Sequence, residues 1–218
     1  MKRPFRTKPA VYALAVVISG GLLSGCVGST TTDSASYTVD SAVTSLKVNA
    51  SGGTIEVVVG GGGSVKVTEN LKYDGDKPRT SHSENGGELT LTAPKDCGGS
   101  GIGGSTCQVD YRVEVPKALA ATLDSDGGAI VVEQAVAGRL TARSDGGKVT
   151  AGFSEAPDSV DINSAGGNVT LRLPDSTYAV DASSDGGNQS VRVRTAPDSP
   201  RKIRARTDGG AVQVLPGT

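Results

Sequence analysis

The chain has 218 residues, with 22 Lys and Arg against 23 Asp and Glu, one His, no Trp, and 31 Gly, about twice the usual share. The near-neutral charge and 3% aromatic content exclude a nucleic-acid surface built on a global positive field and base stacking. A single His leaves almost no material for a Ser-His-Asp triad or a multi-His metal site.

The N-terminal segment, residues 1–25, is predicted to be a lipoprotein signal peptide. Four bases precede an apolar run over residues 10–23, which is short for a membrane span of about 20 residues. The run ends in Leu23-Ser24-Gly25-Cys26, which resembles the lipobox of bacterial lipoproteins. In that family the Cys is acylated and becomes the first residue of the mature chain, so Cys26 would anchor this protein to the membrane. A plain signal peptide or membrane anchor with an incidental Cys is the alternative.

Export would change the charge and the redox environment of the mature chain. Removal of residues 1–25 takes away four bases and no acid, which shifts the net charge from −1 to −5. The Ser/Thr-rich residues 26–36 are predicted to be a flexible tether, followed by one domain over residues 37–218. With Cys26 lipidated, Cys97 and Cys107 are the remaining pair, and an oxidising compartment predicts a disulfide between them.

The loop between these two cysteines contains a misleading motif. Residues 99–104 match G-x-G-x-x-G. Dinucleotide binding through that motif needs a preceding strand and a following helix whose N-terminus faces the pyrophosphate. No helical pattern follows here, so we predict no nucleotide cofactor.

An internal repeat is the most informative feature of the chain. Its Gly-Gly pairs begin at residues 52, 86, 127, 146, 166, 186 and 209. Alternating apolar and polar residues flank each pair, as in strands with one buried face. Pro-Asp-Ser corners at 157, 174 and 197 separate the later copies. The mature protein is therefore predicted to be all-β, a single-domain parallel β-solenoid with rungs of about 20 residues.

An array of antiparallel hairpins is the competing fold, because Asp-Gly is also a strong hairpin signal. A pairing offset near 20 residues would indicate the solenoid, and pairing mirrored about the glycines would indicate hairpins. The region before residue 120 is less regular, and His82, among polar neighbours, is predicted to be a surface residue rather than a ligand or a base.

The solenoid register predicts two kinds of polar rows, one of hydroxyls that point inward and one of charges that point outward. The inward position before each corner holds a hydroxyl, which can pass hydrogen bonds up the stack or bond the corner backbone; these residues are Ser125, Ser144, Ser164, Ser184 and Thr207. Outward charges are expected to pair between rungs. Arg204, Asp181 and Asp161 share one row, Arg143 shares another with Asp124, and Arg172 and Arg192 fall side by side and need another partner or an anion.

At this point the chain resembles a known family. The segment Val113-Glu114-Val115-Pro116-Lys117 and the serial Ser-x-Gly-Gly-x-Val units look like those of a bacterial β-strand-repeat family of candidate adhesins, related to adhesin head domains with a Gly-Ile-Asn motif. The resemblance covers about residues 40–215 and implies a parallel β-solenoid on the cell surface with a role in adhesion or envelope sensing. It implies no catalytic residues.

Two other functions compete with a non-catalytic binding module. Parallel β-helices include polysaccharide-cleaving enzymes that use two nearby carboxylates, for which the stacked pairs Asp126/Asp145 and Asp185/Asp208 are the candidates. The same acidic corner is a candidate for calcium, although the period differs from that of calcium-binding nonapeptide repeats. Turn chemistry explains each of these residues, so we predict no catalytic residue, metal or cofactor. An envelope glycan or a surface protein is the expected partner.

Overall fold

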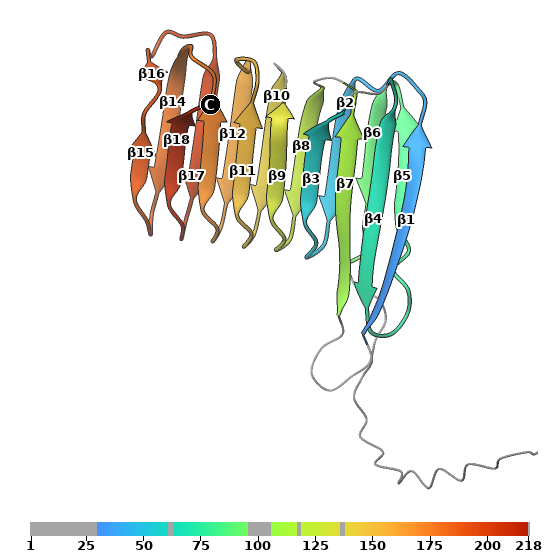
Figure 1. Ribbon diagram of the computed structural model, residues 1–218. Helices are drawn as coiled ribbons and strands as arrows, with labels where there is room; N and C mark the ends of the chain where they lie inside the picture. The colour runs from blue at the N-terminus through green and yellow to red at the C-terminus, as the bar shows by residue number, and fades with distance from the viewer. Residues whose placement is uncertain (1–29, 61–62, 96–105, 117–118, 136–137, 218) are drawn as a thin grey trace, which may run out of the picture.

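Alternation of apolar and polar residues produces two sheets that face each other across one apolar core. The structure is a computed structural model that describes residues 30–60, 63–95, 106–116, 119–135 and 138–217. Within these residues every regular element is a strand, and the strands form two nine-stranded sheets (Figure 1). The prediction of an all-β fold is confirmed. The N-terminal segment, with Cys26, lies outside the described residues.

The order of strands in each sheet shows how the chain is wound. Sheet A runs β1 (Thr31–Val39), β4 (Val65–Tyr73), β7 (Cys107–Val115), β3 (Ile55–Val59), β9 (Ile130–Ala135), β11 (Val149–Phe153), β13 (Val169–Leu173), β18 (Val212–Pro216), β15 (Gln189–Val191). Sheet B runs β16 (Arg194–Thr195), β14 (Thr177–Ser184), β17 (Lys202–Thr207), β12 (Ser159–Ser164), β10 (Arg139–Ser144), β8 (Ala120–Ser125), β2 (Ser45–Ala50), β6 (Glu88–Thr92), β5 (Ser81–Asn85).

Most of the chain forms coils, each with one strand in sheet B, a Gly-Gly corner and the next strand in sheet A. Neighbouring coils pair in parallel, and Leu140 lies beside Ala121 on one side and Val160 on the other. The pairing offsets are thus 19 and 20 residues, as the solenoid predicts. Inward residues such as Leu123, Ala142 and Ile162 are fully buried.

The antiparallel alternative holds locally, near the N-terminus. Gly86 and Gly87 have φ of +57° and +84° and form the tight turn of the hairpin β5–β6, a conformation that favours glycine. Strand β4 also pairs antiparallel with β1 and β7. Residues 31–36, which the sequence assigned to the tether, are part of β1, where Ser34 and Ser36 donate or share side-chain hydrogen bonds with β4.

The order of the coils differs from the order of the chain at both ends. The last coil, β17/β18, lies between β12/β13 and β14/β15, and the first coil, β2/β3, lies between β8/β9 and β6/β7. The C-terminal arrangement has a physical reason in the apolar columns. Coil β17/β18 presents buried Ile203 and Val212 to the core, whereas β14/β15 carries the exposed Gln189 in the position of Val212. The coil that cannot complete the core therefore lies at the end of the stack.

The Gly-Gly corners are held by a ladder of hydroxyl groups. Ser144 accepts a hydrogen bond from the Gly147 amide at 2.8 Å and donates to the Gly128 carbonyl of the neighbouring coil at 3.3 Å. The predicted hydroxyl row thus both bonds the corner backbone and links neighbouring coils. The equivalent bonds recur at Ser125, Ser164, Ser184 and Thr207.

The second glycine of each corner is required by close packing, not by φ. A Cβ on Gly147 would overlap the Gly128 carbonyl, whereas a Cβ on Gly146 would meet no atom within 4 Å. Among the solenoid corners, a positive φ occurs at Gly52, at +73°. Stacked corner backbones therefore approach so closely that no side chain fits between them.

Candidate binding site

The acidic corner residues lie in two separate pairs. In the observed coil order Asp126 stacks next to Asp145 and Asp208 next to Asp185, and Ala165 separates the two pairs. All four aspartates are exposed, and Asp126 lies 3.6 Å from the Lys95 ammonium. Among the described residues, no group of three or more His, Cys, Asp or Glu side chains is arranged to hold a metal ion. A cavity of about 310 Å³ beside Asp126 is lined by Asp124 and Lys95 as well.

The N-terminal end of the core contains a polar cluster of Tyr37, Glu69, Thr80, His82 and Tyr111. Glu69 is 5% exposed and accepts hydrogen bonds from the Tyr37 hydroxyl at 3.1 Å and the Thr80 hydroxyl at 2.7 Å. Burial, together with the nearby Glu69, raises the pKa of the Tyr37 and Tyr111 phenols well above their usual value. His82 is exposed, as predicted, and stacks on Tyr37 with ring centroids 4.7 Å apart. This stack joins β5 of sheet B to β1 of sheet A.

Other predictions fall on parts of the chain beyond the described residues. Cys97 and the G-x-G-x-x-G segment at 99–104 lie in such a part, while Cys107 is the first residue of β7, opposite Tyr73. The disulfide between Cys97 and Cys107 stays a prediction. In the part of the chain that the structure describes, no helix is long and apolar enough to cross a membrane.

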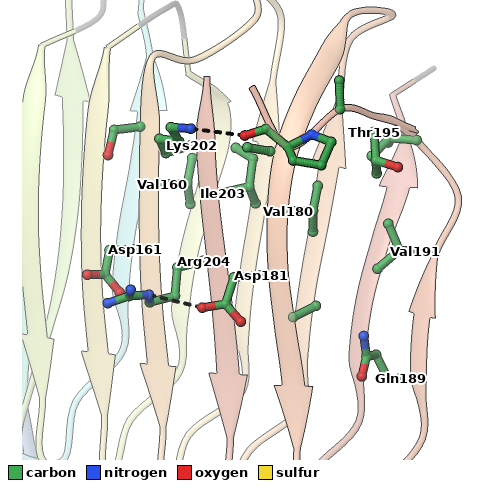
Figure 2. Close-up of a pocket in the computed structure, with 16 residues that line it drawn as sticks. Val160, Asp161, Val180, Asp181, Gln189, Val191, Thr195, Lys202, Ile203 and Arg204 are labelled. Carbon is green, nitrogen blue, oxygen red and sulfur yellow. Dashed lines mark hydrogen bonds and ion pairs between the residues drawn. The ribbon is translucent and has the colours of Figure 1, made fainter. Parts of the chain in front are cut away.

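The C-terminal end of the stack carries the largest cavity that we describe, a groove of about 890 Å³ that we call the terminal groove. Its lining includes the inward side chains Val180, Ala182 and Val191, which are only partly buried because no further coil covers them. Figure 2 shows Val191 and Gln189 on one side of the groove and Val180 on the other. The apolar interior is therefore accessible at this end.

Strand β14 also offers a free backbone edge along this groove. Its pairing with β16 covers Thr177 and Tyr178 alone, whereas Ala179–Ser184 pair with β17 on the other side. The Ala179 amide donates to Arg201 and the Asp185 amide donates to Thr207, both in the direction of β17. By strand alternation the amides of Val180, Ala182 and Ser184 point to the free edge, where another strand could pair.

Charged residues border the groove on the outward face of sheet B. Arg204 shares a row with Asp161 and Asp181, as predicted, and the inserted strand β17 places it between them. Its Nε is 3.4 Å from the Asp181 carboxylate (Figure 2). Arg206 also contacts Asp181, at 2.7 Å. Arg143 lies opposite Asp124 as predicted, although no ion pair joins them in the described part of the chain.

The expectation that Arg172 and Arg192 lie side by side is wrong. Leu215 of the inserted strand β18 lies beside Arg172, and the Arg192 amide donates to Val214 of the same strand. The inserted coil separates the two arginines. Sequence reasoning also missed the terminal groove, although Gln189 in an otherwise apolar column was a signal that its coil is last.

Taken together, stacked coils, a hydroxyl ladder and a groove at one free end define a β-strand-repeat solenoid. Residues 106–213, just under half of the chain, match the model of the Toastrack DUF4097 family. The resemblance stated from the sequence is confirmed. The match begins one residue before β7 and ends at the second residue of β18, so it includes strand β17 of the inserted coil. No curated protein matches the sequence.

Two solved structures are similar to this chain. A candidate cell adhesion protein from Clostridium sporogenes is 12% identical and superimposes with a TM-score of 0.56, covering 85% of this chain and 99% of that one. A candidate adhesin from Parabacteroides distasonis, 9% identical, covers 86% of this chain and 98% of that one with a TM-score of 0.41. The first likeness confirms the solenoid fold at very low sequence identity.

Proposed function

We propose that the protein is an exported, surface-anchored binding module without catalytic activity, tethered through acylated Cys26. The lipobox and the basic, apolar leader support the anchor. The adhesin-like descriptions of the fold's relatives support a role at the cell surface. The predicted disulfide between Cys97 and Cys107 would close a loop beside β7 in the same oxidising compartment.

The observation that carries the proposal is the position of the terminal groove relative to the chain's N-terminal side. Strand β1 is at one edge of sheet A and β15 is at the other, with seven strands between them (Figure 1). At about 4.8 Å per strand, these edges are about 38 Å apart. A chain anchored before β1 would present its terminal groove at the far end, away from the membrane.

The partner that best fits this end is an extended polypeptide segment that adds a strand to β14. The free amides of Val180, Ala182 and Ser184 would supply backbone hydrogen bonds, and the partly exposed Val180 and Val191 would cover apolar side chains of the partner. Addition of a strand would also remove the exposed edge, which otherwise invites uncontrolled pairing.

The test measures how well beads that carry the full chain adhere to native envelope preparations, and compares the unmodified chain with two variants. Ala182→Pro removes one free-edge amide without removing a ladder bond to β17, and edge strands tolerate Pro. We expect Ala182→Pro to abolish adhesion and the control Ala182→Val, which keeps the amide, to preserve at least part of it. Equal adhesion of both variants would contradict strand addition and leave a glycan or a second copy as the occupant.

A second arm tests the absence of catalysis. The protein is incubated with envelope polysaccharides and peptides, and release of products is measured. Turnover that disappears in an Asp185→Asn, Asp208→Asn variant would establish the enzyme alternative.

A third measurement tests the anchor. Intact mass is determined after detergent extraction, and the Cys26→Ser variant should lose both the mass of the acyl chains and the membrane association.

A further inference from the structure

A second, polar cavity lies on the outward face of sheet B, next to the terminal groove. It has a volume of about 210 Å³, and we call it the arginine hollow because Arg143, Arg204 and Arg206 line it. Asn163 and Asp161 also contribute to its lining. The hollow shares Asp161 and Arg204 with the terminal groove, so the two cavities adjoin.

Strand register explains why three arginines meet here. Asn163 of β12 lies directly between Arg143 of β10 and Arg206 of β17. The two flanking strands are therefore about 10 Å apart, which two extended guanidinium side chains can span from opposite sides. The shorter Asn163 forms a floor between them, and its side-chain amide can donate a hydrogen bond.

The arginines retain most of their hydrogen-bonding capacity. In the described part of the chain, Arg143 has neither an ion pair nor a side-chain hydrogen bond. Arg206 and Arg204 each contact Asp181 through one nitrogen, and a guanidinium has five N–H donors. Asp161 is the one carboxylate in the lining that we describe, while Asp181 contacts Arg204 and Arg206 from beside the hollow and Asp124 lies opposite Arg143.

The three arginines that line this one cavity contrast with the acidic character of the molecule as a whole. The full chain has a formal net charge of −1, and removal of the predicted signal peptide makes it −5. Guanidinium groups with unused N–H donors that converge on one cavity would draw an anion to this face of the protein. The hollow is also polar and open, which suits a hydrated charged group better than an apolar ligand.

The inserted coil creates the hollow. If the coils stacked in chain order, Ser183 of β14 would lie beside Asn163, and Arg206 would be one strand farther from Arg143. Asp181 would then lie beside Asp161, so two like charges would be adjacent. Insertion of β17 brings Arg206 within reach of Arg143 and places Arg204 between the two aspartates.

We propose that the arginine hollow binds an oxyanion, a phosphate or carboxylate group carried by an anionic polymer, with Arg143 and Arg206 as its principal ligands. Planar guanidinium groups recognise both kinds of oxyanion through paired N–H donors. Arg204 and the Asn163 amide would complete the contacts. This site lies on the outward face of sheet B, so it does not depend on strand addition at β14.

The test uses the full, isotope-labelled chain in detergent at low ionic strength. Titration with inorganic phosphate should shift the Nε–Hε NMR signals of Arg143 and Arg206 and leave those of Arg172 and Arg192, on the outward face of sheet A, unchanged. Binding of polyphosphate and of polygalacturonate is then measured by calorimetry. A preference for polyphosphate assigns a phosphate ligand to the hollow, and a preference for polygalacturonate assigns a carboxylate.

Two matched double variants locate the site. Arg143→Gln with Arg206→Gln should weaken polymer binding by about tenfold or more, because charge-assisted hydrogen bonds are lost. Arg172→Gln with Arg192→Gln removes the same charge from the opposite face and should change it less than about twofold. Thermal unfolding checks that both remain folded. The proposal is overturned if neither polymer binds the unmodified chain, or if both variants lose affinity equally.

Discussion

At the N-terminal end of the stack, edge strands β1 and β5 bring Tyr37 and His82 together across the two sheets, and Glu69 behind them is buried with hydroxyl partners. At the C-terminal end, Val180 and Val191 of coil β14/β15 remain partly exposed beside a free strand edge. One end is thus covered by the stacked rings and by a buried carboxylate with two hydroxyl donors, while the other leaves apolar core side chains accessible beside a free strand edge. The difference indicates that a partner is more readily accommodated at the C-terminal end.

The largest expected effect concerns the corners that connect both ends. Gly147→Ala would force a Cβ into the Gly128 carbonyl, and we expect it to cost about 4 kcal/mol or more of unfolding free energy, enough to prevent folding. The adjacent Gly146→Ala meets open space and should change stability by less than about 1 kcal/mol. Urea unfolding of both variants measures this. Equal stability would show that coil stacking at the corner is looser than described.

Removal of the buried carboxylate tests the closed end. Glu69→Ala leaves the hydroxyls of Tyr37 and Thr80 without their acceptor, and we expect a loss of about 3 kcal/mol because hydrogen bonds to charged groups are strong. Glu69→Gln keeps an acceptor oxygen and should lose less. The matched change at the open end, Gln189→Ala, should be nearly neutral because Gln189 is exposed. A neutral Glu69→Ala variant would refute the view that this end depends on its polar cluster.

The hydroxyl ladder should weaken towards the open end. Ser144→Ala removes a buried donor and leaves the Gly147 amide unpartnered, which we expect to cost about 2 kcal/mol. Ser184 makes the equivalent two contacts in coil β14/β15, at the end of the stack, but is partly exposed. Ser184→Ala should therefore cost about 1 kcal/mol or less, since water replaces the lost partner. Thermal unfolding of the two variants gives the comparison, and a larger loss at Ser184 would contradict it.

The smallest effect concerns the coil order at the open end. A double-mutant cycle on Arg204 and Asp181, both about half exposed, should give a coupling energy of about 0.2–1 kcal/mol that falls with added salt. The pair Arg172 and Arg192, separated by Leu215, should show no coupling and serves as the control. Repulsive coupling between Arg172 and Arg192 would indicate that the coils stack in chain order instead.

The periodicity in the sequence was sufficient to predict the solenoid and much of its detail. The two-residue alternation identified inward residues such as Leu123 and Ile162, and the aligned corners placed Ser144 in a hydroxyl row and Arg204 in a row with Asp181. Each of these follows from local geometry, because side-chain direction in a strand depends only on residue parity and register only on the spacing of the glycines. The hairpin at Gly86 was the exception, since its glycines match the corner pattern but adopt positive φ.

The sequence alone determined what a coil is, which face of it is buried and how one coil aligns with the next. It did not determine which coils are neighbours, because all of them carry nearly the same pattern and pair in the same register. Only the tertiary structure decided that β17/β18 lies inside β14/β15, and thereby which coil is left exposed. The physical reason is that neighbour choice depends on sums over the whole stack. The complete apolar column of Ile203 and Val212 belongs inside, the exposed Gln189 at the end, and Arg204 between two aspartates that would otherwise repel.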